Sequence, residues 1–444
     1  MFQRMQGYGL TLTAVFLRVL FLWSAVVPAS GLPFLTRLEE NGTLHDGKRV
    51  FVPRGANYIR LNASQGGSGP YDPTNPVYHS TFSPIYFNAT EARSLLSRLR
   101  GNGYNIVRVF VDVGAPNRND GVVKGNYLSP KYMENVAVFV EIAASLQIYT
   151  VPTLFMFPLY TTRYGCNATA TESKSFQFPN DVVFVKGCVK AKEDYARDFV
   201  QDLKHRLGDL SSLAFVSIQN ELNINLGVNP FAQGFSYSVE AADGVLYNMS
   251  RANERQTMFE NCTRYWASSV RAAIKAVSPQ TLVGVGMFTY SAVGRAFASS
   301  KALPPCTPSA EDCRVPPRPS VLERCVDILD VHVYQAPGWG GLKADLDSSD
   351  WESLALNSAA IVMGEFGAWR KNPSVFSNET TAAKAMVHQQ VQSCKFSFQG
   401  WLFWTADTWE QPRLWNFKSA PKIELDLAPT FRPNPCQAGG NDNF

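Results

Sequence analysis

Short apolar runs alternate with longer amphipathic segments along most of the chain. The runs are rich in β-branched and aromatic residues and stop at polar residues or glycine, which is typical of strands buried on both faces. They lie at 50–56, 106–111, 148–154, 214–220, 282–287, 328–334, 360–364 and 398–404. Eight such strands with helices between them predict an α/β fold, the TIM (β/α)8 barrel.

The segments between these runs carry helix signals. Residues 88–91 resemble a capping box, and Leu95, Leu96 and Leu99 then recur on one helical face. Similar apolar stripes precede the third and fourth strands. We interpret these stripes as barrel core rather than as cofactor sites.

Four long irregular segments all follow strands. They cover 59–87, 155–189, 222–251 and 289–324. Loops that follow strands lie on the active-site face of such a barrel, so we expect them to build a cleft or a lid. Cys166 with Cys188, and Cys306 with Cys313, could each close one of these loops by a disulfide, although the pairing of the eight cysteines stays open.

Two glutamates, Glu221 and Glu365, stand where an apolar run stops. Each is therefore expected at the C-terminal end of a barrel strand, where the active site of this fold lies. Two acids placed in this way look like a pair of catalytic carboxylates. The structural alternative is that each acid only caps the next helix or pairs with a neighbouring basic residue.

Composition fits an ordinary globular protein rather than a disordered or fibrous one. The chain has 444 residues, 45% of them hydrophobic and 18% charged, with a formal net charge of +4 and no dense run of Lys or Arg. We therefore expect no nucleic-acid partner. No composition break divides the chain, so we predict one barrel domain over 31–444, acting as a monomer.

The first thirty residues differ from the rest. A basic residue, an apolar stretch and a small-residue end predict a signal peptide at 1–30, while Arg18 inside the stretch leaves an uncleaved anchor as the alternative. No later segment is apolar enough to span a membrane. Seven Asn-x-Ser/Thr sequons and an even cysteine count agree with a secreted or extracellular glycoprotein, or with a lumenal, lysosomal or vacuolar one.

Six motifs together resemble glycoside hydrolase family 5, the cellulase and mannanase family within clan A of retaining β-glycosidases. They are RGANY at 54–58, GYNIVR at 103–108, QNE at 219–221, VHVY at 331–334, GEFG at 364–367 and GWLFW at 400–404. Each motif alone is weak, but their order along successive strands is specific.

The resemblance implies a role for each matching residue. Glu221 would be the general acid/base and Glu365 the nucleophile, giving retention of anomeric configuration. Arg108 and Tyr334 would hold the nucleophile ionised, and Asn220 would bind the sugar 2-hydroxyl. The resemblance also implies that no metal or organic cofactor is needed.

Two further residues complete the implied substrate site. His332 would lie beside the acid/base, and Trp404 would form the floor of the sugar site. The structural alternatives are that His332 is a core histidine with its hydrogen bonds satisfied and that Trp404 is a core tryptophan. The tryptophans at 339, 369, 409 and 415 could line sugar subsites or anchor loops equally well.

The chain departs from the family after the third strand, where many members carry a histidine. This chain reads TLFMFP at 153–158 instead. The mannanase-like branches often lack the histidine too, which favours a mannan or an unusual glucan. The predicted activity is thus a β-1,4-type mannanase or glucanase. Transglycosylation, cleavage of a glycolipid and a non-catalytic carbohydrate-binding surface protein are the alternatives.

Overall fold

The computed structural model describes residues 31–436, apart from 41, 48, 60–80, 85, 113–120, 156–162, 294–302, 304–305, 309–311, 336–340, 350, 352–358, 371–375, 377 and 408–413. The predicted signal peptide at 1–30, the sequons at Asn41 and Asn62, and the tryptophans Trp339 and Trp409 lie outside the described residues. Their roles stay predictions.

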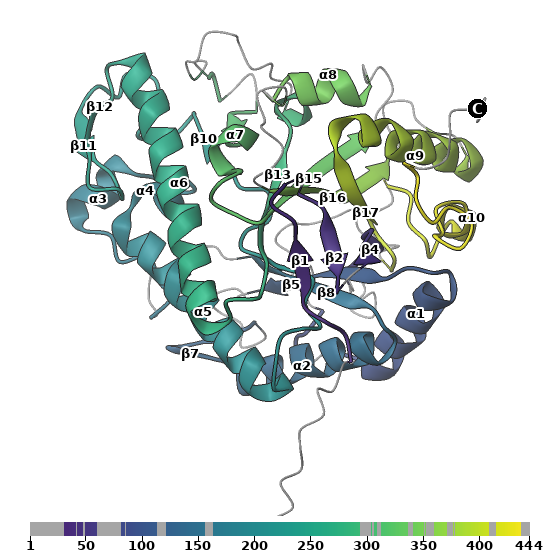
Figure 1. The fold of residues 1–444 in the computed structure, drawn as a ribbon. Coiled ribbons are helices and arrows are strands. Elements are labelled where there is room, and N and C mark those ends of the chain that lie inside the picture. The colour runs from purple at the N-terminus through teal and green to yellow at the C-terminus, as the bar shows by residue number, and fades with distance from the viewer. Residues whose placement is uncertain are drawn as a thin grey trace, which may run out of the picture.

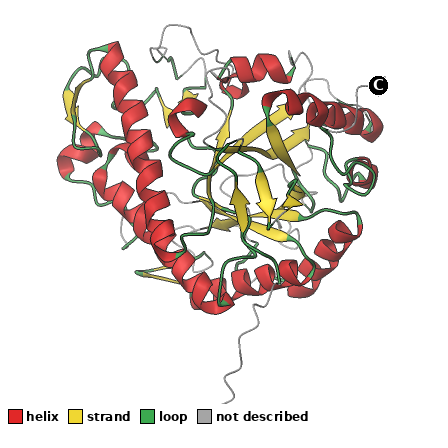
Figure 2. Ribbon diagram, in the orientation of Figure 1, coloured by secondary structure: helices red, strands yellow, loops and turns green. Residues whose placement is uncertain are grey.

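Eight parallel strands form a closed barrel in chain order, as the sequence predicts. They are β4 (Arg54–Tyr58), β5 (Ile106–Asp112), β8 (Tyr149–Phe155), β9 (Val216–Ser217), β13 (Val283–Phe288), β15 (Ile328–Gln335), β16 (Ala360–Ala368) and β17 (Phe398–Phe403). Figure 2 shows these strands in yellow at the centre, with the helices in red around them. The first predicted strand is displaced, because Pro53 and its neighbours separate β4 from the short β3 (Arg49–Val50).

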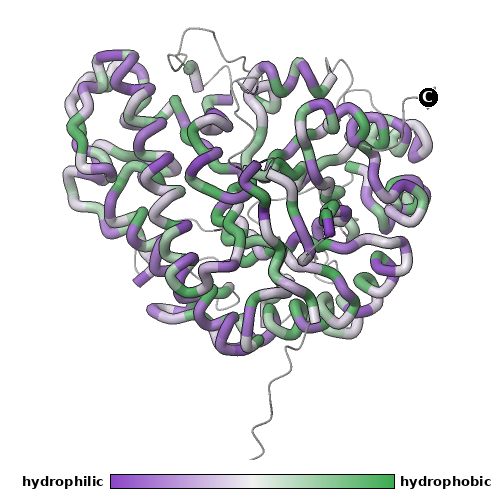
Figure 3. The backbone as a smooth tube through the Cα atoms, in the orientation of Figure 1, coloured by the Kyte–Doolittle hydropathy of each residue, from purple (hydrophilic) through white to green (hydrophobic). Residues whose placement is uncertain are grey.

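Helices cover the outside of the barrel (Figure 1). They are α1 (Ala89–Gly101), α2 (Pro130–Ser145), α5 (Lys186–Leu207), α6 (Ala252–Val277), α7 (Pro319–Leu322), α8 (Leu342–Asp347), α9 (Glu379–Ser393) and α10 (Pro421–Asp426). Asn88 caps α1 by accepting a hydrogen bond from the Glu91 amide, which confirms the predicted helix start. Green segments concentrate in the strands, whereas the outer helices alternate green and purple (Figure 3).

Short helices and strands lie outside the barrel. Loop insertions contain α3 (Ala170–Ser175), α4 (Asp181–Phe184) and three two-stranded sheets. The sheets pair β6 (Val123–Lys124) with β7 (Tyr127–Leu128), β10 (Ile224–Asn225) with β14 (Arg314–Val315), and β11 (Ser238–Glu240) with β12 (Leu246–Asn248).

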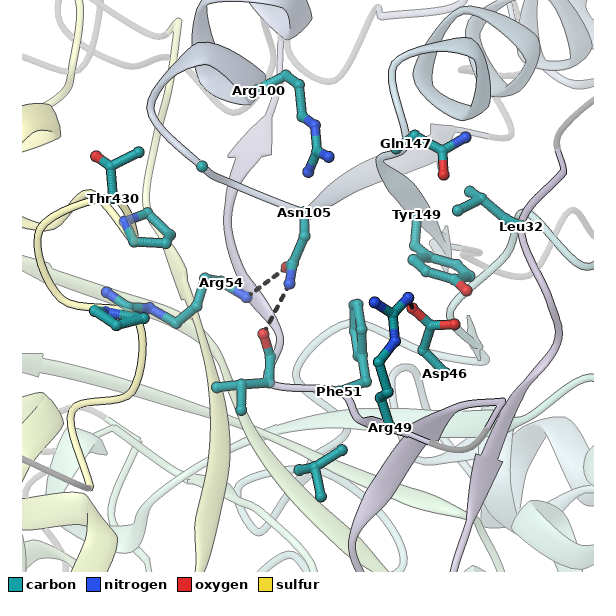
Figure 4. A pocket seen from close by; sticks show the side chains of 15 residues that line it. Leu32, Asp46, Arg49, Phe51, Arg54, Arg100, Asn105, Gln147, Tyr149 and Thr430 are labelled. Carbon is teal, nitrogen blue, oxygen red and sulfur yellow. Dashed lines mark hydrogen bonds and ion pairs between the residues drawn. The ribbon is translucent and has the colours of Figure 1, made fainter.

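The N-terminal end of the barrel is covered by β1 (Leu35–Arg37), β2 (Leu44–Asp46) and β3, which form an antiparallel sheet. Leu35 and Leu44 pack in one buried cluster with residues at the starts of the barrel strands. A pocket of about 520 Å³ lies at this end. Figure 4 shows Asn105 in it, bridging the Arg54 amide and the Val52 carbonyl. The pocket is therefore far along the strands from both glutamates.

Disulfides close the two loops that the sequence suggests, Cys166–Cys188 and Cys306–Cys313. A third, Cys394–Cys436, ties the segment after α10 to the end of α9. This pairing was not predicted, because sequence spacing does not reveal which distant cysteines meet. None of the described helices is long and apolar enough to cross a bilayer.

Candidate active site

Arg108 lies at the centre of the candidate site and is fully buried. Its Nη1 donates to Glu365 Oε1 at 2.7 Å and to Asn57 Oδ1 at 3.0 Å. Its Nε donates to Asp330 Oδ2 at 3.1 Å, and its Nη2 donates to Asn220 Oδ1 at 2.8 Å. One guanidinium thus joins side chains from β4, β15, β16 and the segment after β9, a task that suits its planar fork of donors.

The sequence predicts that Glu365 follows its strand. In the structure, Glu365 lies within β16. Pairing with β15 continues beyond it, as far as Gln335 with Ala368. The predicted strand end at 364 is therefore wrong, because the apolar run stops before the hydrogen-bonded ladder does. Glu221, in contrast, comes after β9, as predicted.

A β-bulge turns Glu365 into the barrel. Asp330 pairs with Val362, and His332 pairs with Glu365, so two residues of β16 lie against one of β15 between these pairs. Strict alternation would put Glu365 on the same face as Met363, which packs in the core cluster shared with the helices. The extra residue reverses this and aims the carboxylate inward.

Two hydrogen-bond donors and the His332 ring surround the Glu365 carboxylate. Besides Arg108, the Tyr334 hydroxyl donates to Oε2 at 2.6 Å, and His332 Nδ1 lies 3.4 Å from the same oxygen. His332 Nδ1 also lies 3.1 Å from Glu221 Oε1. One carboxylate oxygen of Glu221 and one of Glu365 lie within 4.8 Å of each other. The sequence-predicted residues therefore converge, with His332 between the two acids.

The backbone at Glu221 is unusual, with a φ of +46°. The amide of Leu222 donates to the Gly286 carbonyl at 2.8 Å, and the Gly286 amide donates to the Gln219 carbonyl at 2.9 Å. A Cβ on Gly286 would lie 3.0 Å from that Gln219 oxygen, so glycine permits the close approach. These contacts hold Glu221 in a conformation that non-glycine residues rarely adopt.

Asp330 and Asn57 belong to the site, although the sequence analysis gave them no role. Asp330 is fully buried against Arg108, and a Cβ on Gly364 would lie 1.6 Å from its Oδ1. Asn57 Nδ2 donates to the Gly364 carbonyl at 2.9 Å. One signal was available: Asp330 is an acid inside an apolar run, two residues before His332, and alternate residues of a strand share a face.

Three carboxyl groups and two cations make up the buried cluster. Burial raises the pKa of Asp330, but Arg108 and His332 outweigh burial and hold it below its usual value. Burial lowers the pKa of His332, but Glu365, Asp330 and Glu221 together raise it to about 10. With all three acids ionised and His332 protonated, the cluster carries a formal charge of −1.

The two glutamates differ in pKa in the opposite sense to the expected one. Burial raises the pKa of Glu365, and the neighbouring cations His332 and Arg108 offset only part of this, so it lies above its usual value. Burial also acts on Glu221, but the hydrogen bond from His332 brings its pKa below the usual value. In the unliganded site, the labile proton therefore lies on His332.

Of three described tryptophans, two lie at or next to the site and the third anchors a loop. Trp404 is 5% exposed and packs edge to face on Phe110 at 5.8 Å, and the Arg108 guanidinium lies over the same Phe110 ring. Trp369 lies 6.2 Å from the Tyr334 ring, next to the site. Trp415 is a packed loop anchor whose indole donates to the Phe376 carbonyl.

A cleft of about 290 Å³ borders Glu221. Asn220, Asn223, Phe178 and Arg314 line it. Phe178 and Arg314 come from insertions that follow β8 and β13, and the Cys166–Cys188 and Cys306–Cys313 disulfides close those insertions. The loops predicted to build a cleft therefore contribute side chains beside one of the two acids.

Metal-ligand groupings occur twice in the described part of the chain. Cys166, Asp181 and Cys188 form one, but its two sulfurs are joined in a disulfide. Glu221, His332 and Glu365 form the other. A cation there would have to displace the proton on His332 and lie close to Arg108, which disfavours it electrostatically.

Replacing Arg108 by glutamine is expected to destabilise the fold by about 3–5 kcal/mol near neutral pH, because it leaves two buried carboxylates without their cation. The loss should shrink at acid pH, where those carboxylates are protonated. The free energy of unfolding in urea, measured near neutral pH and at acid pH, tests both expectations. Arg108→Lys keeps the charge and should lose less; equal losses for both variants at all pH values would contradict the account.

Replacing His332 by glutamine should cost less stability as the pH rises. The raised pKa means that the folded protein holds a proton that the unfolded chain releases between pH about 6.5 and about 10. The stabilisation is complete below this window and is lost as pH increases through it. The difference in free energy of unfolding between wild type and variant should therefore narrow across the window; a constant difference would show that His332 does not carry the proton.

Comparison with known proteins gives a consistent result. The family model for cellulase (glycosyl hydrolase family 5) matches residues 70–407. No curated protein sequence matches the chain significantly. Among solved structures, the endo-1,4-β-mannanase from Rhizomucor miehei is similar with a TM-score of 0.55 at 11% identity, covering 90% of this chain and 100% of the mannanase.

Two other structures are similar in fold. The endo-β-1,4-mannanase from Thermotoga petrophila has a TM-score of 0.52 at 13% identity, covering 86% of this chain and 76% of its own. A broad-specificity endoglucanase from an uncultured bacterium has a TM-score of 0.50 at 13% identity, covering 86% of this chain and 94% of its own. Since the family model spans more than half of the sequence, the chain belongs to glycosyl hydrolase family 5, and its broad activity is that of a β-glycoside hydrolase.

Proposed function

We propose that the protein is a retaining β-glycosidase that cleaves β-1,4-linked mannan or glucan, with Glu365 as nucleophile and Glu221 as general acid/base. The observation that carries the proposal is that one carboxylate oxygen of Glu221 and one of Glu365 lie within 4.8 Å of each other. Retaining enzymes keep their two carboxyl groups about 5–5.5 Å apart, whereas inverting enzymes need about 6.5–9.5 Å to admit a water molecule.

In the first step, a Glu365 oxygen bonds to the anomeric carbon while the bond from that carbon to the leaving oxygen breaks. Glu221 transfers its proton to the leaving oxygen. Arg108 and Tyr334 orient Glu365 for attack. In the second step, Glu221 takes a proton from water, whose oxygen displaces Glu365 from the sugar.

His332 supplies the proton that Glu221 needs at the start. It lies 3.1 Å from Glu221 Oε1 and carries the labile proton of the empty site. A bound sugar excludes water from Glu221, which favours its neutral form and draws the proton across. Thus the low pKa of Glu221 in the empty site is compatible with its role as acid.

The remaining residues bind the sugar. Asn220 Oδ1 is engaged by Arg108, which leaves the amide nitrogen to donate to the sugar 2-hydroxyl. Trp404 provides an aromatic face below the ring. The leaving group lies on the side of Glu221, where the cleft lined by Phe178 and Arg314 can receive it.

The substrate is tested by incubating purified protein with mannan, glucan, xylan, glycolipids and aryl β-glycosides. We expect cleavage of mannan or glucan, and NMR should detect the β-anomer as the first product. An α-anomer first would mean inversion. Saturable binding without cleavage of any of these would favour the carbohydrate-binding alternative, and products longer than the substrate would favour transglycosylation.

The mature protein is proposed to be secreted. Three disulfides fit an oxidising compartment, and the N-terminal thirty residues are predicted to be a signal peptide. N-terminal sequencing of the protein from its natural source would test this, since an intact Met1 would contradict cleavage.

A further inference from the structure

Among the described strands, the barrel ladder is shortest on the two sides of β9, the strand that leads to Glu221, and of these the pairing with β8 is the shorter. Strands β8 and β9 pair only at Thr153 with Ser217, beside an isolated bridge between Thr150 and Leu213. In contrast, β5 and β8 pair along the whole of both strands. Backbone pairing between β8 and β9 therefore does little to fix the segment that leads into Glu221.

A buried lysine bonds both β8 and the segment after β9. Lys192 of α5 is fully buried, and its Nζ donates to the Leu154 carbonyl at 2.7 Å and to Gln219 Oε1 at 3.1 Å. Leu154 lies near the end of β8, and Gln219 follows β9. Lys192 thus connects β8 to the segment after β9, beyond the last residues at which the two strands pair.

No carboxylate pairs with Lys192 among the residues that the structure describes. Its Nζ also lies 5.6 Å from the centre of the Tyr195 ring on the same helix. Burial lowers the pKa of Lys192 to about 7. Taking an unpaired ammonium out of water costs several kcal/mol, so a lysine at this position is hard to explain by stability alone. Both the ammonium and the neutral amine have enough N–H groups for the two hydrogen bonds.

The contact reaches Glu221 through the main chain. Gln219 lies two residues before Glu221, and its carbonyl accepts from the Gly286 amide. Leu222, on the other side of Glu221, donates to the Gly286 carbonyl. The side chain of Gln219 is held by Lys192 and its backbone by Gly286, so the strained residue between these anchors has little freedom to move.

We propose that Lys192 is a positioning residue that fixes the acid/base Glu221 by tethering Gln219 to the end of β8. This inference rests on the proposed function, because it has Lys192 support the residue that donates the proton, Glu221, and not the nucleophile. Glu365 is held by Arg108 and Tyr334, neither of which bonds Lys192 or Gln219 among the described contacts.

The leaving group distinguishes this role from a merely structural one. A poor leaving group such as phenolate needs the proton of the general acid, whereas dinitrophenolate departs without it. A displaced Glu221 should therefore slow cleavage of phenyl glycosides much more than cleavage of dinitrophenyl glycosides. A general loosening of the barrel would lower both rates by a similar factor.

The test measures kcat/KM of Lys192→Met on aryl β-glycosides of graded leaving-group ability. We expect a fall of about 100-fold on the phenyl glycoside and of less than about threefold on the dinitrophenyl glycoside. Lys190→Met is the matched control, because Lys190 lies on the same helix but is 58% exposed. It should behave as wild type.

Gln219→Leu is the second variant, in case Lys192→Met does not fold. It removes only the tethered side chain, leaves Lys192 bonded to Leu154, and should give the same selective loss. Equal losses on all leaving groups, or none, in both variants would overturn the role of Lys192. If the wild-type protein cleaves none of these glycosides, the proposed function itself fails.

Discussion

Replacing Glu365 by glutamine is expected to lower kcat by several orders of magnitude while leaving the fold intact. An amide oxygen cannot form the glycosyl-enzyme bond, so the first chemical step is lost. Glutamine has nearly the same shape and can still accept from Tyr334. It also removes one negative charge from a buried cluster with a formal charge of −1, so no buried cation is left in excess.

The measurement is kcat on the best substrate, together with circular dichroism and thermal unfolding. Glu424→Gln is a matched control, because Glu424 is also buried but bonds Asn102 and Arg98 far from the site. The control should keep full activity. Wild-type activity in Glu365→Gln would mean that another group is the nucleophile.

Replacing Glu221 by alanine is expected to abolish cleavage of natural substrates but to spare the first step on dinitrophenyl glycosides. That leaving group needs no proton, and Glu365 is still present to attack. The second step then becomes slow, because no base activates water. The variant should accumulate the glycosyl-enzyme, visible as a burst of released phenolate.

Azide should rescue this variant. A small anion can enter the space left by the Glu221 side chain, which is 32% exposed, and attack the sugar without a base. The product should be the β-glycosyl azide, identified by NMR. Glu240→Ala, on the exposed face of β11, should show neither the defect nor the rescue. An α-glycosyl azide, or no rescue, would contradict the role of Glu221.

The apolar runs predict all eight barrel strands, because each strand is buried on both faces and so reads as a continuous run. They do not predict where hydrogen bonding stops, as β9 and β16 illustrate: β9 is much shorter than its run, and β16 is longer. The residues brought together at the site were predicted through the family resemblance, since no local pattern relates Arg108 to Glu365.

Two features of the site could not be predicted in this way. The bulge that turns Glu365 inward depends on the register between β15 and β16, which is a property of the paired strands and not of either run. The order of the pKa values depends on counting every buried charge, including Asp330. The expectation that Arg108 and Tyr334 would hold Glu365 ionised left out burial, which raises the pKa of Glu365.

The central claim is that Glu365 becomes covalently bound to the sugar. It is tested most directly by inactivating the enzyme with 2-deoxy-2-fluoro glucosyl and mannosyl fluorides and mapping the labelled peptide by mass spectrometry. The account predicts one sugar per protein, attached to Glu365, and no label in Glu365→Gln. A label on Glu221 or Asp330, or inactivation without any gain in mass, would contradict it.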